Sequence, residues 1–263
     1  MPFTLLAHQS PVVPLKWWRP RLFSGTALVL GSMAPDFHYV LLQTLDPTFS
    51  HSIKGQFFEC LPLTLILWLI IKTVVAAPLS AHLPDLGKFH LRDYRTVAAP
   101  IGLRDVGVAI ISALIASFSH IAIDGFSHKR GFAVAWFPSL TTEIAITSTR
   151  TIPIYFILQF LLSIIGIAAA IWQLHFIGKR RLLLSWHPDS PPPLLPTRRS
   201  HIILWTCFAV FAVSGTAYRL TLPDAFAHTH EPWFWGHELL QTMCFATIGM
   251  VLGCVIAKRF MRG

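Results

Sequence analysis

Three side chains that bind metals or protons recur at four-residue steps near the end of an apolar stretch. They are His120, Asp124 and His128. Residues four apart on an α-helix lie on the same face, so these three would share one stripe. Burial of a carboxylate in hydrocarbon costs about 3 kcal/mol, which a neutral imidazole beside it does not offset. A divalent cation offsets it, because it binds deprotonated Asp and neutral His together. The spacing therefore favours a polar site that holds a metal.

More residues of the same types occur far away in the chain. We predict that the metal ligands are His8, Asp36, His51, His120 and Asp124. Mixed imidazole and carboxylate ligation suits Zn²⁺, Mn²⁺ or Fe²⁺, and the number of candidates leaves room for one or two ions. A site of this kind with an open position lowers the pKa of bound water, which is the chemistry of a metal-dependent hydrolase. Candidates for the proton carrier are Glu59, His128 and Glu231, and the sequence does not rank them.

Each of these residues also has a simpler explanation. A single histidine at a membrane interface often serves only as a hydrogen-bonded amphipathic residue. Asp36 follows a proline and could be a turn residue at a helix end. The functional interpretation therefore depends on whether several stretches converge on one face of the protein.

Composition indicates the class of protein. Of 263 residues, 54% are hydrophobic and only 13% are charged, and the mean hydropathy is +0.58. So little polar surface could not cover a water-soluble globule of this size, which predicts a polytopic membrane protein. The start of the chain has no basic region and is broken by prolines, so we expect no cleavable signal peptide. The four cysteines stand singly in or beside apolar segments, as small buried hydrophobic residues do.

We predict an all-α bundle in one integral membrane domain over residues 1–263. Five segments are long enough to cross about 30 Å of hydrocarbon. They are residues 57–77, 105–126, 153–177, 201–222 and 237–257. Residues 1–160 would form the metal-site half, 178–200 a basic, proline-rich, extended cytoplasmic linker, and 201–257 a C-terminal helix pair.

The N-terminal region predicts a hairpin of two short helices. Pro35 limits the segment 22–34 to about 20 Å, which is too short for an easy crossing. The preceding apolar segment, 5–17, is joined to it by KWWRPR, and tryptophan beside cations is typical of a membrane interface. The tip would lie at one interface, and both open ends, near His8 and Asp36, would return to the opposite one.

The distribution of Lys and Arg predicts the orientation. With these spans, sixteen of the 21 basic residues fall on the side that holds the hairpin tip and the 178–200 linker. The positive-inside rule makes that side cytoplasmic. All five predicted ligands then lie at the extracytoplasmic face of a cell inner (plasma) membrane. Basic residues in cytoplasmic loops also explain the net charge of +9, and we see no nucleic-acid-binding motif. We therefore expect the bilayer and a lipid-linked substrate as partners.

Two further segments lie on the extracytoplasmic side. HTHEPWFWGHE is rich in ligand chemistry, but it could equally be an aromatic-belt loop before a helix. Its ionisable residues are His228, His230, Glu231, His237 and Glu238, and whether they belong to the site stays open. Residues 131–140, GFAVAWFPSL, are too short to span and could line the substrate side or form a buried loop.

Several blocks of the sequence carry a resemblance to known families. The chain resembles an uncharacterised bacterial membrane family in its MPFTLLAHQSPVVPL start and its GSMAPDF and SHIAIDGFSH blocks. The order of His8, Asp36, His51, His120 and Asp124 is more distantly similar to the LexA-regulated, membrane-bound metal-dependent hydrolases. The second resemblance implies metal-dependent hydrolysis without naming a substrate. It covers roughly residues 1–160, and FSH stands where the first family usually has FTH.

The function that these observations favour is hydrolysis of an ester or phosphoester on a lipid-borne substrate. A transporter or a scaffold protein with a polar or metal-binding cavity is the alternative. A transporter should continue its polar residues across the membrane in repeated halves, and we see neither feature. A haem electron carrier needs facing histidine pairs near mid-membrane, and only His120 could lie that deep.

Overall fold

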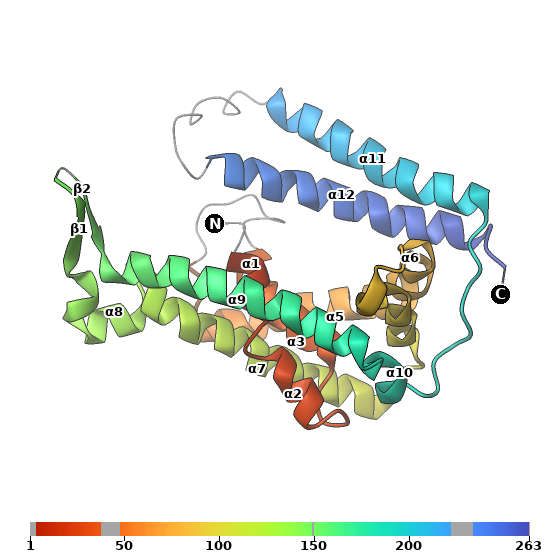
Figure 1. Cartoon of the computed structure of the whole chain (residues 1–263), viewed down its shortest axis with the longest axis horizontal. Helices are drawn as coiled ribbons and strands as arrows, with labels where there is room; N and C mark the ends of the chain where they lie inside the picture. Colours follow the sequence, from red (N-terminus) through yellow and green to blue (C-terminus); the bar gives the residue numbers. More distant parts are fainter. Residues whose placement is uncertain (1–3, 38–47, 149, 222–233, 263) are drawn as a thin grey trace.

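The computed structural model describes residues 4–37, 48–148, 150–221 and 234–262 (Figure 1). Within these residues it is a bundle made almost entirely of helices. Five helices are long and apolar enough to cross a membrane, and each overlaps one of the predicted spans. They are Ile53–His82, Leu103–Ser127, Ile154–Lys179, Arg198–Leu220 and Gln241–Lys258. The predicted all-α membrane class is confirmed.

The first long span is a continuous helix with two widened turns. It consists of α4 (Ile53–Gly55), a π-helical turn (Gln56–Cys60), α5 (Leu61–Ile70), a second π-helical turn (Ile71–Val75) and α6 (Ala76–His82). Pro62 and Pro78 each lie shortly after one of these turns. A proline has no N–H to donate, and its ring clashes with the carbonyl four residues earlier. A π-turn relieves both problems without breaking the helix.

Two pairs of long helices form the rest of the bundle. The helices α7 (Leu103–Ser127) and α9 (Ile154–Lys179) contact each other beside the N-terminal helices. The helices α11 (Arg198–Leu220) and α12 (Phe234–Lys258) lie side by side on one flank of the molecule (Figure 1). They join the first span through α12, where Cys254 and Ala257 pack with Val75.

The N-terminal hairpin contains three short helices rather than two. They are α1 (Thr4–Ala7), α2 (Val13–Trp18) and α3 (Gly25–Met33), and a 3₁₀ turn (Ala34–Asp36) follows. The prediction of one helix over 5–17 was wrong, because Pro11 and Pro14 interrupt the backbone hydrogen bonds between α1 and α2. The second leg was correct, since α3 ends at Met33, two residues before Pro35.

The segment between α7 and α9 holds a β-hairpin that we did not predict. A short helix, α8 (Phe132–Trp136), and a 3₁₀ turn (Pro138–Thr141) lead into strands β1 (Glu143–Thr147) and β2 (Arg150–Pro153). The strands pair antiparallel, with Glu143 opposite Pro153. β1 is exposed along its whole length, although Ile144 and Ile146 share one face and Glu143 and Thr147 the other, as in a half-buried strand.

We expected the basic segment 178–200 to be extended, but part of it is helical. It begins with a helix, α10 (Leu182–Trp186), whose Leu183 packs against Val13 and Ile177. The segment before α7 also contains 3₁₀ turns (Gly87–Phe89 and Leu91–Ala98). An ion pair joins these two stretches, because the Arg181 guanidinium donates to both carboxylate oxygens of Asp93 at 2.5 and 2.8 Å. These contacts close one end of the bundle.

Candidate metal centre

Four of the five predicted metal ligands meet at one point. The ligand atoms of Asp36, His51, His120 and Asp124 all lie within 4.8 Å of one another. They come from separate parts of the fold: the 3₁₀ turn after α3, the residues before α4, and the last third of α7. The fifth, His8, directly follows α1 and places its Nε2 atom 3.3 Å from Asp124 Oδ1.

The separations within the group of four match those of ligands around one cation. His120 Nε2 lies 3.2 Å from Asp124 Oδ2 and 3.6 Å from Asp36 Oδ1. His51 Nε2 lies 3.4 and 3.8 Å from the same two oxygens. Ligands bound at about 2.1 Å in a tetrahedron are about 3.4 Å apart. The four side chains therefore have room for an ion between them.

The ring of His120 is oriented for a metal by a backbone carbonyl. Its Nδ1 lies 2.7 Å from the Ser32 carbonyl oxygen, which can only accept a hydrogen bond. A proton therefore sits on Nδ1, and Nε2 faces the two carboxylates, where a bound cation would take its lone pair. Metal-binding histidines usually have this kind of partner on the far nitrogen. Nε2 is fully buried and makes no hydrogen bond, which is the state of a ligand atom that faces a cation site.

His51 is oriented in a similar way through its neighbour Ser50. The Ser50 hydroxyl donates to the Pro35 carbonyl at 2.9 Å, and its oxygen can accept a hydrogen bond. His51 Nδ1 lies 3.2 Å from that oxygen and can donate to it, which leaves Nε2 to face Asp36 and Asp124. Since Pro35 directly precedes Asp36, this hydrogen bond also ties the two ligand-bearing segments together.

Asp124 faces two different sets of histidines with its two oxygens. Oδ2 faces His51 and His120, and Oδ1 faces His8 Nε2 at 3.3 Å and His128 Nδ1 at 3.4 Å. The His8 ring stacks on His120, with 3.9 Å between ring centroids. His8 therefore supports Asp124 and His120 and is not a member of the group of four.

His128 joins the cluster to a small cavity. Its Nδ1 contacts the Ser127 hydroxyl at 3.2 Å, and its Nε2 lies 3.2 Å from the amide nitrogen of Gln159 on α9. The His128 side chain is 45% exposed, whereas Asp124 is almost buried. A cavity of about 150 Å³ is lined by His8, Asp124, His128 and Gln159, among others. The cavity lies on the Oδ1 side of Asp124, and that oxygen itself is buried.

The other predicted candidates lie elsewhere. Glu59 lies half-buried in the first π-turn and is not a member of the group of four. His228, His230 and Glu231 lie outside the described residues. His237 and Glu238 belong to α12, but their side chains are not among those described.

Close helix packing holds the ligand-bearing segments in register. A side chain added at Gly31 on α3 would lie 2.6 Å from the backbone oxygen of Ala113 on α7, so only glycine allows this approach. Gly166 on α9 is equally tight against Ala7, the residue before His8. Two buried apolar residues, Leu28 and Ala116, fill the same interface. The helices that carry Asp36, His120 and His8 are thereby held together.

Two contributors to the site were not predicted as such. The Ser32 carbonyl and the Ser50 hydroxyl orient the histidines, but neither is an ionisable residue. The only signal in the sequence is the pair Ser-His, which occurs in the site at Ser50-His51, Ser119-His120 and Ser127-His128 and also outside it at Ser200-His201. The hydroxyl contacts the adjacent ring in the first and the last of these pairs.

Comparison with known proteins identifies only a family. The model of a domain of unknown function (DUF4184) matches residues 1–258. This match confirms the expected resemblance to an uncharacterised family. No curated protein and no solved structure matches the chain.

Proposed function

We propose that this chain, which belongs to the DUF4184 family of unknown function, is a membrane-bound hydrolase that depends on a divalent metal. The observation that carries the proposal is the convergence of two imidazole nitrogens, that of His120 fully buried, and two carboxylates from distant segments. Five candidate spans indicate a multi-pass membrane protein. We place it in a bacterial inner membrane, with the basic loops in the cytoplasm and the metal site at the opposite face.

The donor set fits Zn²⁺, Mn²⁺ or Fe²⁺. Asp36, His51, His120 and Asp124 would hold the ion, and Nδ1 of each histidine has an oxygen acceptor that leaves Nε2 for the metal. The bound cation would supply Lewis acidity and lower the pKa of a water molecule. It would also balance the charge of two carboxylates that lie close together in an apolar setting.

The residues around Oδ1 of Asp124 would handle the proton. His128 is the best-placed carrier, because it contacts Asp124, is half exposed and lines the small cavity. Its hydrogen-bond partners, Ser127 and Gln159, would hold the ring in place during the transfer. On these contacts we assign the proton transfer to His128.

The substrate would be an ester or phosphoester of a lipid. The ligands lie at the ends of membrane spans, which is the depth of lipid head groups. The cavity of about 150 Å³ admits a water molecule and a small polar group but not a whole lipid. Apolar clusters built on Ala27, Trp68 and Ala109 fill the bundle beyond the site. They favour an enzyme over a transporter, whose pathway would have to continue through them.

Elemental analysis of detergent-purified protein tests the metal site. We expect about one divalent ion per chain in the native protein and almost none in an Asp36→Asn, Asp124→Asn double variant. The control is Glu143→Gln, which removes a carboxylate from the exposed β-hairpin, outside the site. Equal metal contents in the native protein and the double variant would rule out these ligands.

Hydrolysis assays test the reaction itself. The probes are bis(4-nitrophenyl) phosphate and 4-nitrophenyl butyrate in detergent micelles, with and without a chelator. We expect turnover that the chelator abolishes, and a loss of about 10²-fold or more in His128→Gln with the metal content preserved. A protein that holds the metal but hydrolyses neither these probes nor phospholipids would instead be a metal-binding transporter or scaffold.

A further inference from the structure

A second polar site lies at the other end of the same helices. A cavity of about 920 Å³ is walled by α2, the loop before α3, the first span, the start of α7 and the end of α10. Along α7, Asp105 at this cavity and Asp124 at the metal centre are nineteen residues apart, or about 28 Å. The cavity is therefore separate from the metal centre and independent of the function proposed for it.

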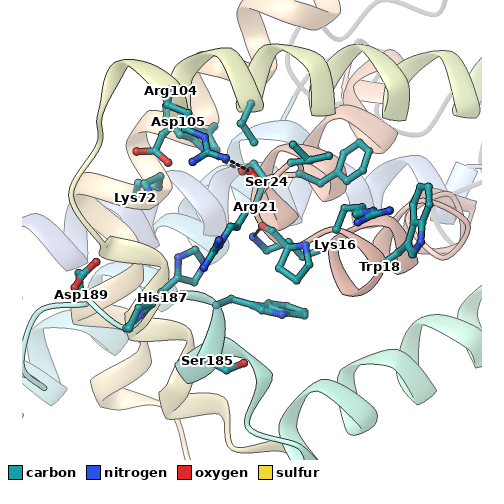
Figure 2. Close-up of a pocket in the computed structure, with 18 residues that line it drawn as sticks. Lys16, Trp18, Arg21, Ser24, Lys72, Arg104, Asp105, Ser185, His187 and Asp189 are labelled. Atoms are coloured by element: carbon teal, nitrogen blue, oxygen red, sulfur yellow. Dashed lines mark hydrogen bonds between the residues drawn. The ribbon is translucent and has the colours of Figure 1, made fainter.

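The walls of the cavity carry an excess of positive charge. Five cations line it against two carboxylates, those of Asp105 and Asp189. The cations are Lys16, Arg19, Arg21, Lys72 and Arg104. Figure 2 shows these charges around a common space, with Lys16 and Trp18 on one side and Lys72 and Asp189 on the other. A ligand that complements this surface carries at least two negative charges.

Two of the cations are buried, which distinguishes them from ordinary basic residues at a membrane surface. The exposed fractions are 5% for Lys16 and 9% for Lys72. Lysines at an interface normally extend the ammonium group into water. Here the Lys16 ammonium donates to the Pro20 carbonyl and lies 5.4 Å from the Trp186 ring, and that of Lys72 lies 5.6 Å from the Trp68 ring.

The buried ammonium groups have no anionic partner in the described part of the chain. No carboxylate there forms an ion pair with either lysine, and Asp105 instead accepts a hydrogen bond from the Gly102 N–H at the start of α7. Burial, and next the charge of Lys72, lower the pKa of Lys16 to about 8. Burial and these two lysines likewise lower the pKa of His187 to about 4. The charge of Asp105 raises the pKa of both groups and so compensates the positive field only in part.

The remaining lining fits an organic phosphate better than a bare ion. Three of the five cations are arginines, whose planar groups bind phosphate oxygens in pairs. Trp18, Trp68 and Trp186 supply apolar faces between the charges. A volume of about 920 Å³ is that of a pocket for a molecule of moderate size and far exceeds inorganic phosphate. Because the cavity lies at one end of the membrane spans, it is also at the depth of the lipid head groups.

We propose that this cavity binds the phosphate group of an organic phosphate, with Lys16 and Lys72 as its buried anchors. Arg21 and Arg104 are placed at the mouth, where Arg104 donates to the Arg21 carbonyl at 3.5 Å and both side chains are exposed. The phosphate can belong to a lipid head group or to a soluble phosphate ester. The chemistry of recognition is the same for both, and the experiment distinguishes them.

The test measures binding to purified full-length protein at low ionic strength. One arm titrates glycerol 3-phosphate by calorimetry in detergent without phospholipid. The other compares nanodiscs of phosphatidylcholine with and without phosphatidic acid by thermal unfolding. Stabilisation by phosphatidic acid alone identifies a lipid ligand, and binding of glycerol 3-phosphate identifies a soluble one.

Charge-neutralising variants locate the binding in the cavity. Lys16→Gln with Lys72→Gln should raise the Kd at least about tenfold. The matched control, Lys88→Gln with Lys258→Gln, removes two exposed charges outside the cavity and should leave the Kd within about twofold. If the buried pair proves necessary for folding, Arg21→Gln with Arg104→Gln removes two exposed cavity cations and should also weaken binding. The proposal fails if neither probe binds, or if the cavity variants bind as the control does.

Discussion

Removal of the metal should destabilise the protein, and loss of Asp124 should abolish that effect. In the structure both oxygens of Asp124 face histidines, and the side chain is almost buried. The ligands extend from residue 36 to residue 124, so the unfolded chain cannot present them together. A cation that binds only the folded state stabilises it by linkage.

The size of the effect follows from this linkage. At a free metal concentration of 100 times the Kd, the cation contributes about 2.7 kcal/mol to the free energy of unfolding. For a chain of this size, 1 kcal/mol corresponds to about 2–4 °C in Tm. We therefore expect a chelator to lower the Tm of the native protein by about 5–10 °C.

The Tm of the Asp124→Asn variant should not respond to the chelator. Without the carboxylate the metal does not bind, so the chelator should change the Tm by less than about 1 °C. In Glu143→Gln, the control, the full response to chelation should remain.

Thermal unfolding in detergent, followed by intrinsic tryptophan fluorescence, measures the three proteins with and without chelator, six conditions in all. Equal Tm values for native protein with and without chelator would contradict the linkage. So would an Asp124→Asn variant that still loses 5–10 °C on chelation. Either result would mean that the four side chains cluster for a structural reason and not around a metal.

Three other predictions concern the packing and charges of the bundle. Gly31→Ala should lower the free energy of unfolding by about 1–3 kcal/mol and reduce the metal content, because the new methyl group meets the Ala113 backbone and separates α3 from α7. Thermal unfolding measures the first effect and elemental analysis the second. Unchanged values would contradict the prediction. Asp93→Asn should destabilise by about 1–3 kcal/mol, less than for a fully buried pair because the Arg181 side chain is 48% exposed, whereas full native stability would show that the pair is dispensable. Burial lowers the pKa of His187 to about 4 from 6.5, so the unfolded chain binds more protons between these values and stability is lost as the pH falls through this window. The Tm of a His187→Gln variant, measured with chelator, should fall less than that of the native protein from pH 7 to pH 4.5, and parallel curves would refute the assignment.

Much of the architecture could be predicted from local patterns. The five spans follow from the length and hydropathy of each apolar run, because a helix in lipid satisfies its own backbone groups whatever its neighbours are. The break at Pro35 was also predicted from a local property, since proline ends a helix whatever surrounds it. The β-hairpin at 143–153 was missed although Ile144 and Ile146 alternate with more polar residues, because a single short exposed strand is a weak signal between two long apolar helices.

The site was only partly predictable. Residue types and the four-residue spacing on α7 identified His120 and Asp124, and the count of basic residues placed His8, Asp36 and His51 on the same face. No pattern in the sequence separates the four ligands from His8, since that depends on distances between segments. The same limit applies to the cationic cavity, whose basic residues we had explained by the positive-inside rule alone.

The sequence by itself determined that this is a membrane bundle with ionisable residues at one end of its spans. Hydrophobicity, helix length and proline positions are properties of single segments, and they are sufficient for that conclusion. Only the tertiary structure decided which nitrogen of each histidine faces the carboxylates, and which lysines are buried in a cavity. Those features arise where distant segments pack together. The Ser32 carbonyl contacts His120 of another helix, and Lys16 of α2 lines the same cavity as Lys72 of the first span.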